Sequence, residues 1–206
     1  YGFRYIKIEG LEGELRLEDF EAIPICSGFD RIGEFSSSNP IINQLQHNIE
    51  WGFWGNFVDV PTDCPQRDER LGWTGDAQVF FRTASFLGKV DNFFNKWLSD
   101  LKADQRHDGR VPRIIPDTYS NGDYRTAATG WADASVIIPW NHYMAFGNVN
   151  ILEQQYNSMK GWVDYMVSQS KDRGWLWNNG SHYGDWLFYS LSNDPGGQSA
   201  VTSSHL

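Results

Sequence analysis

Segments with helical periodicity alternate with irregular loops along most of this sequence, and that alternation limits the fold more than any other feature. Residues 40–56, 74–87, 90–103, 131–146 and 150–170 carry apolar side chains three or four positions apart, as one buried helix face requires. The loops between them are rich in glycine, proline, acids and aromatic rings. Such helices, joined by loops that gather at one end, are typical of an α-helical toroid. We therefore predict a mainly α-helical chain.

Local signals mark where several of these helices begin and end. Asn39 is a good N-cap, and Pro40 suits the first position of the first helix. Asp76 falls in the first turn of the second helix, where the unpaired amides favour a carboxylate, and Gly88 should end that helix. Pro139 should kink or divide the segment 131–146.

The N-terminal part has a different pattern. Apolar residues alternate with polar ones in places between residues 1 and 29, most cleanly around Leu15 and Leu17, which predicts a few antiparallel strands. So few strands cannot close a sheet by themselves. We therefore expect residues 1–34 to be the last strands of a β-domain and a linker, with the front of that domain absent, and residues 35–206 to be the helical domain. A short strand is also expected near Trp175–Trp177.

Composition excludes several classes of function. A net charge of −9 disfavours nucleic acid and an anionic membrane surface as partners. The sequence contains no apolar run long enough to span a bilayer. Two cysteines are too few for a disulfide scaffold, and the five histidines show no metal-ligand spacing, so we predict no metal and no cofactor. Aromatic residues make up 16% of the chain, which is compatible with a carbohydrate cleft as well as with a large core.

The segment from Asp59 to Asp76 is the strongest candidate for a site. It holds five carboxylates and two arginines, and its two prolines and Gly72 prevent one regular helix. A solvated surface loop is the simpler explanation for such a charge run. Cys64, Leu71 and Trp73 argue against it, because these apolar groups favour burial and would carry the neighbouring carboxylates inward. Buried carboxylates need partners, which the arginines can supply.

The sequence DCPQRDERLGWTGD, residues 63–76, closely resembles the signature of bacterial α-L-rhamnosidases of glycoside hydrolase family 78. Further similarity follows in the same order at GWADA (130–134), PW (139–140) and YGDW (183–186), so the resemblance covers most of the chain. It implies an (α/α)6 barrel preceded by β-sandwich domains. This chain would then hold the end of a sandwich and roughly the first half of the barrel, a partial toroid. The resemblance also implies a bacterial protein that hydrolyses terminal α-L-rhamnosides of glycans or glycosides, whether periplasmic, extracellular or cytoplasmic.

Glycoside hydrolysis by inversion needs a carboxylic acid that protonates the leaving oxygen and a second carboxylate that activates water. Glu69 is our candidate for the acid. Neighbouring carboxylates and burial beside Trp73 favour the protonated form that a general acid needs, whereas a close arginine would favour the ionised form. The resemblance places the general acid of the family at the same position.

Substrate-binding residues are expected around this acid. Ionised Asp63 and Asp76 can accept hydrogen bonds from sugar hydroxyls, and Arg67 can donate to them or orient an acid. The resemblance places all three on substrate-contacting positions and Trp73 on an aromatic wall of the pocket. It also places Asp123, Trp131 and Trp186 around the sugar. Core packing is the alternative for the two tryptophans, and Asp133 and Asp185 are expected to cap or brace loops.

No residue here matches the general base of the family, a glutamate in the second half of the barrel. The 206-residue chain alone is therefore expected to be inactive. Two other classes remain open: a non-catalytic carbohydrate-binding protein, and another (α/α)6 enzyme, either an inverting hydrolase or a polysaccharide lyase. A binding protein would hold sugar without turnover, and a lyase would need a basic, tyrosine or histidine proton abstractor. The signature at residues 63–76 speaks against both.

Overall fold

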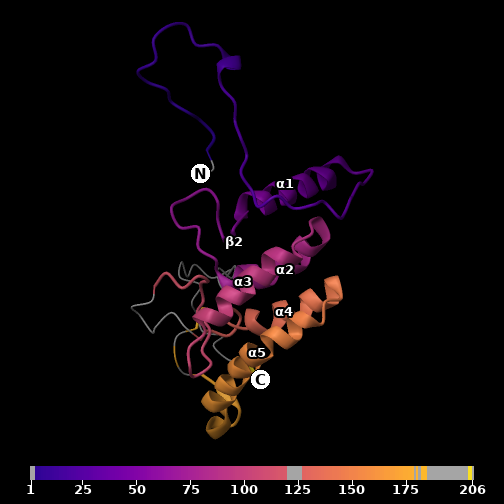
Figure 1. Ribbon diagram of the computed structural model, residues 1–206, viewed down its shortest axis with the longest axis vertical. Coiled ribbons are helices and arrows are strands. Elements are labelled where there is room, and N and C mark those ends of the chain that lie inside the picture. The colour runs from indigo at the N-terminus through magenta and orange to yellow at the C-terminus, as the bar shows by residue number, and fades with distance from the viewer. Residues whose placement is uncertain (1–2, 120–126, 179, 181, 185–203, 206) are drawn as a thin grey trace, which may run out of the picture.

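The computed structural model describes residues 3–119, 127–178, 180, 182–184 and 204–205, and its architecture is mainly helical (Figure 1). The α-helices are α1 (Pro40–Asn56), α2 (Thr74–Leu87), α3 (Asp91–Asp104), α4 (Ala134–Phe146) and α5 (Asn150–Ser170). The antiparallel strand pairs are β1 (Phe57–Val58) with β2 (Val60–Pro61), and β3 (Leu176–Trp177) with β4 (Ser204–His205). The short 3-10 helices are η1 (Leu17–Asp19) and η3 (Lys171–Arg173).

The predicted helix signals are confirmed at several ends. The Asn39 side chain accepts a hydrogen bond from the Ile41 amide at 2.9 Å, which caps α1, and Pro40 is its first residue. Helix α2 begins at Thr74 and ends immediately before Gly88. Helix α5 has the expected bounds, and β3 forms where a short strand was predicted.

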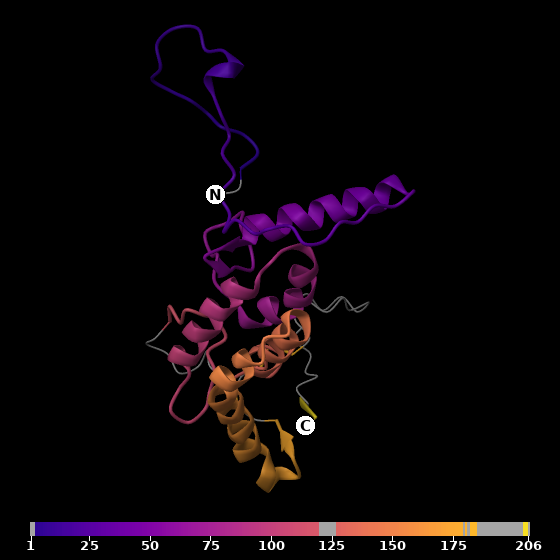
Figure 2. The same cartoon turned by 45° about the vertical axis from the view of Figure 1, so that its right-hand side comes forward.

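Helix α4 lies at the centre of the packed helices, because it contacts α2, α3 and α5 (Figures 1 and 2). Its buried face includes Ile138 and His142, and the His142 Nε2 atom donates to the Asp91 carbonyl at the start of α3 at 3.1 Å. Trp162 of α5 is fully buried, and its indole N–H donates to Asp133 at 2.8 Å. Helices far apart in sequence are thus fixed against one core.

Pro139 does not divide α4, so of the two predicted outcomes the break is absent, and the kink stays a prediction. The helix runs unbroken from Ala134 to Phe146 with Pro139 inside it, and it begins three residues later than position 131. Pro139 is buried, and the packing of α4 against three other helices compensates for the backbone hydrogen bond that a proline cannot make. Residues 131–133 instead form a turn that leads into the helix.

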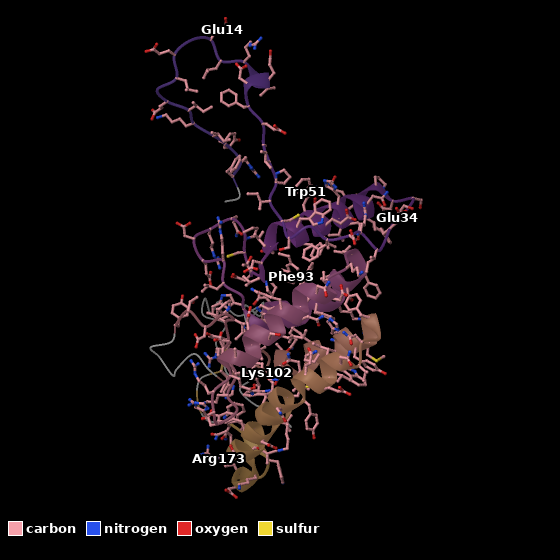
Figure 3. The ribbon with its side chains drawn as sticks, viewed as in Figure 1. Glu14, Glu34, Trp51, Phe93, Lys102 and Arg173 are labelled. Carbon is pink, nitrogen blue, oxygen red and sulfur yellow. The ribbon has the colours of Figure 1, made fainter. Side chains whose placement is uncertain are left out.

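Phenylalanine rings connect α1 to α3. The Phe57 and Phe93 rings stack with their centroids 5.0 Å apart, and Phe29 packs against both Phe53 and Phe93. Figure 3 shows Phe93 between the ribbon of α1 and the other helices. This cluster also holds the chain around residue 29 against the helices, with a backbone bridge between Arg31 and Gly88.

Residues 3–29 form no strand, contrary to the strands predicted for this part of the chain. Every side chain from residue 3 to 28 is exposed, and the segment extends away from the helices, as the position of Glu14 shows (Figure 3). A strand needs a partner edge and a surface on which to bury its apolar face. Among the described residues, the end of this segment has such contacts, because the Ser27 amide donates to the Phe57 carbonyl at 3.1 Å and Phe29 packs among the phenylalanine rings. Residues 3–26 have neither within the described part of the chain. The assignment of residues 1–34 to the end of a β-domain stays a prediction.

None of the helices in the described part of the chain combines the length and the apolar character needed to cross a membrane.

Candidate active site

The segment from Asp59 to Asp76 is fixed onto a second loop at residues 113–115. The amide and the hydroxyl of Thr74 both donate to the Arg113 carbonyl, at 2.8 and 3.0 Å. The Ile115 amide donates to the Gly72 carbonyl at 2.8 Å. Gly72 is required here, because a Cβ at this position would lie 2.0 Å from the Ile115 carbonyl oxygen. Three hydrogen bonds therefore anchor the C-terminal end of the irregular segment to this loop.

A tight turn within this segment brings its acids together. The Asp63 amide donates to the Leu71 carbonyl at 3.2 Å, which closes the loop between them. Arg70 has a φ of 51°, and its Nε atom donates to the Arg67 carbonyl at 3.1 Å. Positive φ is unfavourable for an arginine, so these contacts must hold the turn in its conformation. As a result Asp63 and Glu69 lie side by side.

Glu69 is held by both of its carboxylate oxygens. The Trp73 indole N–H donates to Oε1 at 2.9 Å. On the other oxygen, Oε2, Arg67 donates from Nε at 3.0 Å and from Nη2 at 2.5 Å. The Glu69 carboxylate, through this hydrogen bond and its charge, raises the pKa of Arg67 above its usual value. In this arrangement an exposed guanidinium holds one oxygen of Glu69 and an indole holds the other.

Asp63 and Asp76 complete the acidic group. Asp63 is largely buried, with 12% of its side chain exposed, and lies 3.5 Å from the Arg67 guanidinium. Asp76 lies in the first turn of α2, and its side chain is exposed to solvent. Partial desolvation by the surrounding protein raises the pKa of Asp76, and the charges of Asp63 and Glu69 add to this effect.

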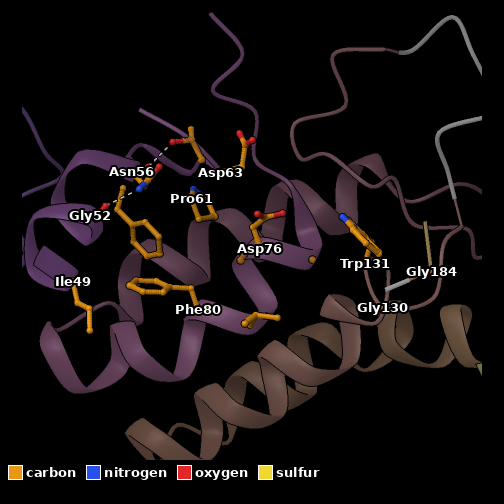
Figure 4. A pocket seen from close by; sticks show the side chains of 15 residues that line it. Ile49, Gly52, Asn56, Pro61, Asp63, Asp76, Phe80, Gly130, Trp131 and Gly184 are labelled. Carbon is orange, nitrogen blue, oxygen red and sulfur yellow. Dashed lines mark hydrogen bonds between the residues drawn. The ribbon is translucent and has the colours of Figure 1, made fainter. Parts of the chain in front are cut away.

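These side chains surround one small pocket, which we call the acidic pocket. Its volume is about 130 Å³, and its lining residues are Asp63, Arg67, Glu69, Trp73, Asp76, Trp131 and Tyr183. A wider and more apolar groove of about 590 Å³ adjoins it and shares Asp63, Asp76 and Trp131. Figure 4 shows Asp76 in the middle of this groove, with Trp131 on one side and Ile49 at the far end. Carboxylates beside aromatic rings suit a sugar, whose hydroxyls donate and whose C–H faces are apolar.

The structure brings together most of the residues predicted from the sequence. Asp63, Arg67, Glu69, Trp73, Asp76 and Trp131 all line the acidic pocket. Trp131 therefore faces a cavity, and core packing does not describe it. Asp133 braces its loop as expected, because its carboxylate accepts from the Gly130 amide at 2.7 Å as well as from Trp162. Asp123, Asp185 and Trp186 lie outside the described residues, so their predicted roles stay predictions.

Among the described residues, two at the site were not predicted. Tyr183 lines the acidic pocket, and the buried Arg113 guanidinium lies 4.4 Å from the centre of its ring. Tyr183 belongs to the YGDW sequence that carries part of the family resemblance, so this signal could have identified it. Arg113 lies in a long loop with no local pattern that distinguishes it. Its contact with the pocket residue Tyr183 arises only when the chain folds.

Asp63, Cys64 and Glu69 offer ligand atoms within 4.8 Å of one another, a spacing that could hold a metal ion. The Arg67 guanidinium, however, contacts both Asp63 and Glu69 and supplies the positive charge that these carboxylates need. The Cys64 Sγ atom lies 4.0 Å from Glu69 Oε2, at the limit of a weak hydrogen bond. The absence of a metal stays a prediction from the sequence.

Replacing Asp76 with asparagine should make the protein more stable at neutral pH. The pKa of Asp76 is raised in the folded state, so the folded protein binds the Asp76 proton more tightly than the unfolded chain does. The stabilising effect of this proton is lost as the pH rises from about 3.8 through the folded pKa. We expect a modest effect, since the side chain is accessible to solvent. Urea unfolding of wild type and Asp76→Asn between pH 3 and 8 measures it. Equal free energies of unfolding at pH 7 would contradict this prediction.

The carboxylates and aromatic rings of the acidic pocket lie on loops and at a helix start of a mainly helical domain. The chain belongs to the family described as the bacterial alpha-L-rhamnosidase six-hairpin glycosidase domain, which matches residues 30–205. An α-L-rhamnosidase of Formosa agariphila is 41% identical over 189 residues, which are 91% of this chain and 20% of that protein. The chain thus spans about a fifth of the length of this relative.

Two solved structures share the fold. The crystal structure of Streptomyces avermitilis α-L-rhamnosidase complexed with L-rhamnose superposes with a TM-score of 0.73 at 40% identity, and covers 79% of this chain and 15% of that one. The α-L-rhamnosidase of Dictyoglumus thermophilum superposes with a TM-score of 0.78 at 36% identity, and covers 84% of this chain and 19% of that one. The predicted fold class, a partial six-hairpin helical toroid, is confirmed by these similarities.

Proposed function

We propose that the protein carrying this chain hydrolyses terminal α-L-rhamnosides by inversion, with Glu69 as the general acid. The observation that carries the proposal is the acidic pocket, in which Glu69 lies among Asp63, Asp76 and aromatic rings. The relatives are named α-L-rhamnosidases, and one solved structure holds L-rhamnose. In this proposal Asp63 and Asp76 accept hydrogen bonds from the sugar hydroxyls, and Trp73 and Trp131 flank the ring.

Glu69 must carry a proton to act as an acid, whereas in this structure Arg67 donates two hydrogen bonds to its Oε2 atom. The Arg67 side chain is 60% exposed, so it has room to change rotamer. We propose that sugar hydroxyls compete for the donors of Arg67 when substrate binds, which weakens the Arg67–Glu69 pair and frees Oε2 of Glu69 to carry the proton. Asp76 is the second candidate for the acid, because its pKa is already raised in the free protein.

Asp63 is a poor candidate for the second carboxylate of an inverting pair. One of its oxygens lies within 4.8 Å of a Glu69 oxygen, whereas the carboxyl groups of inverting glycosidases stand about 6.5–9.5 Å apart to admit a water molecule. Asp63 and Glu69 also share Arg67. We therefore keep the prediction that the general base lies elsewhere in the domain, and that the 206-residue chain alone has negligible turnover.

The test is the hydrolysis of 4-nitrophenyl α-L-rhamnoside by the protein that contains this chain, with the product anomer followed by ¹H NMR. We expect the β-anomer of rhamnose to appear first, as inversion requires. First appearance of the α-anomer would disprove inversion. Rhamnose binding without turnover would favour the carbohydrate-binding alternative, and an unsaturated product from a uronic-acid polymer would favour a lyase. The 206-residue chain, assayed beside it, tests the prediction on the general base.

A further inference from the structure

Arg113 is a buried cation directly behind the wall of the acidic pocket. Only 2% of the residue is exposed, and its backbone carbonyl is fixed by the two hydrogen bonds from Thr74. Its guanidinium carbon lies 4.4 Å from the centre of the Tyr183 ring. A desolvated guanidinium over an aromatic face is strongly attracted to it. Arg113 therefore holds Tyr183 in place, although the described residues next to Tyr183, 182 and 184, belong to no helix or strand.

Tyr183 in turn contacts the two tryptophans of the pocket. Its ring meets Trp73 edge to face, with centroids 5.9 Å apart, and meets Trp131 in the same way at 4.8 Å. Edge-to-face pairs at these distances are attractive and have a preferred angle. The indole of Trp131 also abuts Gly75, where a Cβ would lie 2.8 Å from Nε1. The contact with Tyr183 thus positions the Trp73 indole, and the contact with Arg113 positions Tyr183.

We propose that Tyr183 is a positioning residue for the general acid and acts through Trp73. The Trp73 indole N–H holds Glu69 Oε1 at 2.9 Å, which leaves Oε2 as the oxygen that carries the proton once Arg67 has moved. A carboxyl group held by one oxygen presents the other in a defined direction. Without Tyr183 the indole can rotate, and the Glu69 carboxyl group loses that direction. This inference rests on the proposed hydrolysis with Glu69 as the acid.

If Tyr183 positions the general acid, its loss has an effect that the loss of a residue that only packs in the pocket wall would not have. Proton donation matters most when the leaving group is a poor one, such as a sugar or an alkyl alcohol, and matters least for an acidic phenol. Loss of Tyr183 should therefore slow the cleavage of poor leaving groups more than that of good ones. The hydrogen bonds of Asp63 and Asp76 to the sugar remain, so the affinity for free rhamnose should change little.

The first experiment compares Tyr183→Leu and Tyr183→Phe with wild type on a series of rhamnosides whose leaving groups differ in acidity. For Tyr183→Leu we expect kcat/KM to fall roughly ten-fold or more for a methyl or sugar leaving group and about three-fold or less for 2,4-dinitrophenol. Tyr183→Phe keeps the ring and should stay within about three-fold of wild type throughout. An equal fall for every leaving group, with a weaker inhibition by rhamnose, would assign Tyr183 to sugar binding and overturn the proposal.

Tyr165→Leu is the matched control. Tyr165 is also partly buried between two tryptophans, with its ring 5.9 Å from Trp162 and 5.6 Å from Trp177, but it does not line the acidic pocket. Tyr165→Leu should therefore remove aromatic packing contacts similar to those that Tyr183→Leu removes. We expect no dependence on the leaving group for this variant. A dependence equal to that of Tyr183→Leu would mean that packing in general, and not the contact to Trp73, is responsible.

A second experiment needs no activity and so separates this inference from the proposed function. In ¹⁵N-tryptophan-labelled protein, the Trp73 indole signal is identified by its loss in Trp73→Phe, and its exchange with water is measured. We expect exchange about ten-fold faster in Tyr183→Leu and nearly unchanged in Tyr183→Phe and Tyr165→Leu. Unchanged exchange in Tyr183→Leu overturns the positioning role. If exchange rises as expected while Glu69→Gln retains full activity, the contact chain stands and the assignment of the acid fails.

Discussion

Glu69→Gln is expected to lower kcat on α-L-rhamnosides by about 10²–10⁴-fold, the range that a positioned general acid contributes. Glutamine keeps the size of the side chain and can still accept from the Trp73 indole, which now donates to Glu69 Oε1. It cannot donate a carboxyl proton. Steady-state kinetics on a sugar-linked rhamnoside and on 4-nitrophenyl α-L-rhamnoside measure the loss. The sugar-linked substrate should lie at the upper end of the range, because its leaving group is the poorer one.

Two comparisons make this result specific. Glu153→Gln removes the same charge from an exposed position of α5 and should leave kcat unchanged. Asp76→Asn removes the rival acid. If Asp76→Asn abolishes activity with a strong leaving-group dependence while Glu69→Gln shows none, the roles of the two carboxylates must be exchanged. Retention of most of the activity by Glu69→Gln on both substrates would rule out Glu69 as the acid.

The helical part of the fold could be predicted because its signals are local. The Asn39–Pro40 start of α1 and the glycine after α2 set their ends with little help from the rest of the chain. The apolar stripe of α3 predicted a buried face, and Phe94, Trp97, Leu98 and Leu101 are all fully buried. Local signals left the outcome open where packing decides it. Pro139 stays inside α4 because three other helices surround it.

The alternating residues before Phe29 predicted strands that the structure does not contain in this segment. A period of two makes one apolar face, but it cannot supply the neighbouring strand that would pair with it. Within the described residues, residues 3–26 have no such neighbour and stay exposed. The same limit applies to the site. The acids lie within one continuous sequence and could be found from it, whereas Arg113 and Tyr183 meet across 70 positions of sequence, and their pairing depends on the folded backbone.

Gly72→Ala should be among the most destabilising single-methyl changes in the chain. The added Cβ would lie 2.0 Å from the Ile115 carbonyl oxygen, a distance that no rotamer can relieve because both groups belong to backbone. The carbonyl cannot easily retreat, since it accepts a hydrogen bond from the fully buried Trp97 indole at 3.1 Å. Either the hydrogen bond from Ile115 to Gly72 breaks or the indole loses its partner. We expect a loss of about 3 kcal/mol or more in the free energy of unfolding, at or beyond the usual cost of overpacking.

Gly52→Ala is the matched control, because the same methyl group enters open space there. Gly52 lies inside α1, and its added Cβ would have no neighbouring atom within 4 Å. Alanine favours a helix over glycine by about 0.5–1 kcal/mol, so this variant should be slightly more stable than wild type. Thermal unfolding of both variants and the recovery of activity after refolding measure the contrast. If Gly72→Ala unfolds at the temperature of wild type, the acids between Asp63 and Asp76 are held by their own turn and not by the loop at residues 113–115.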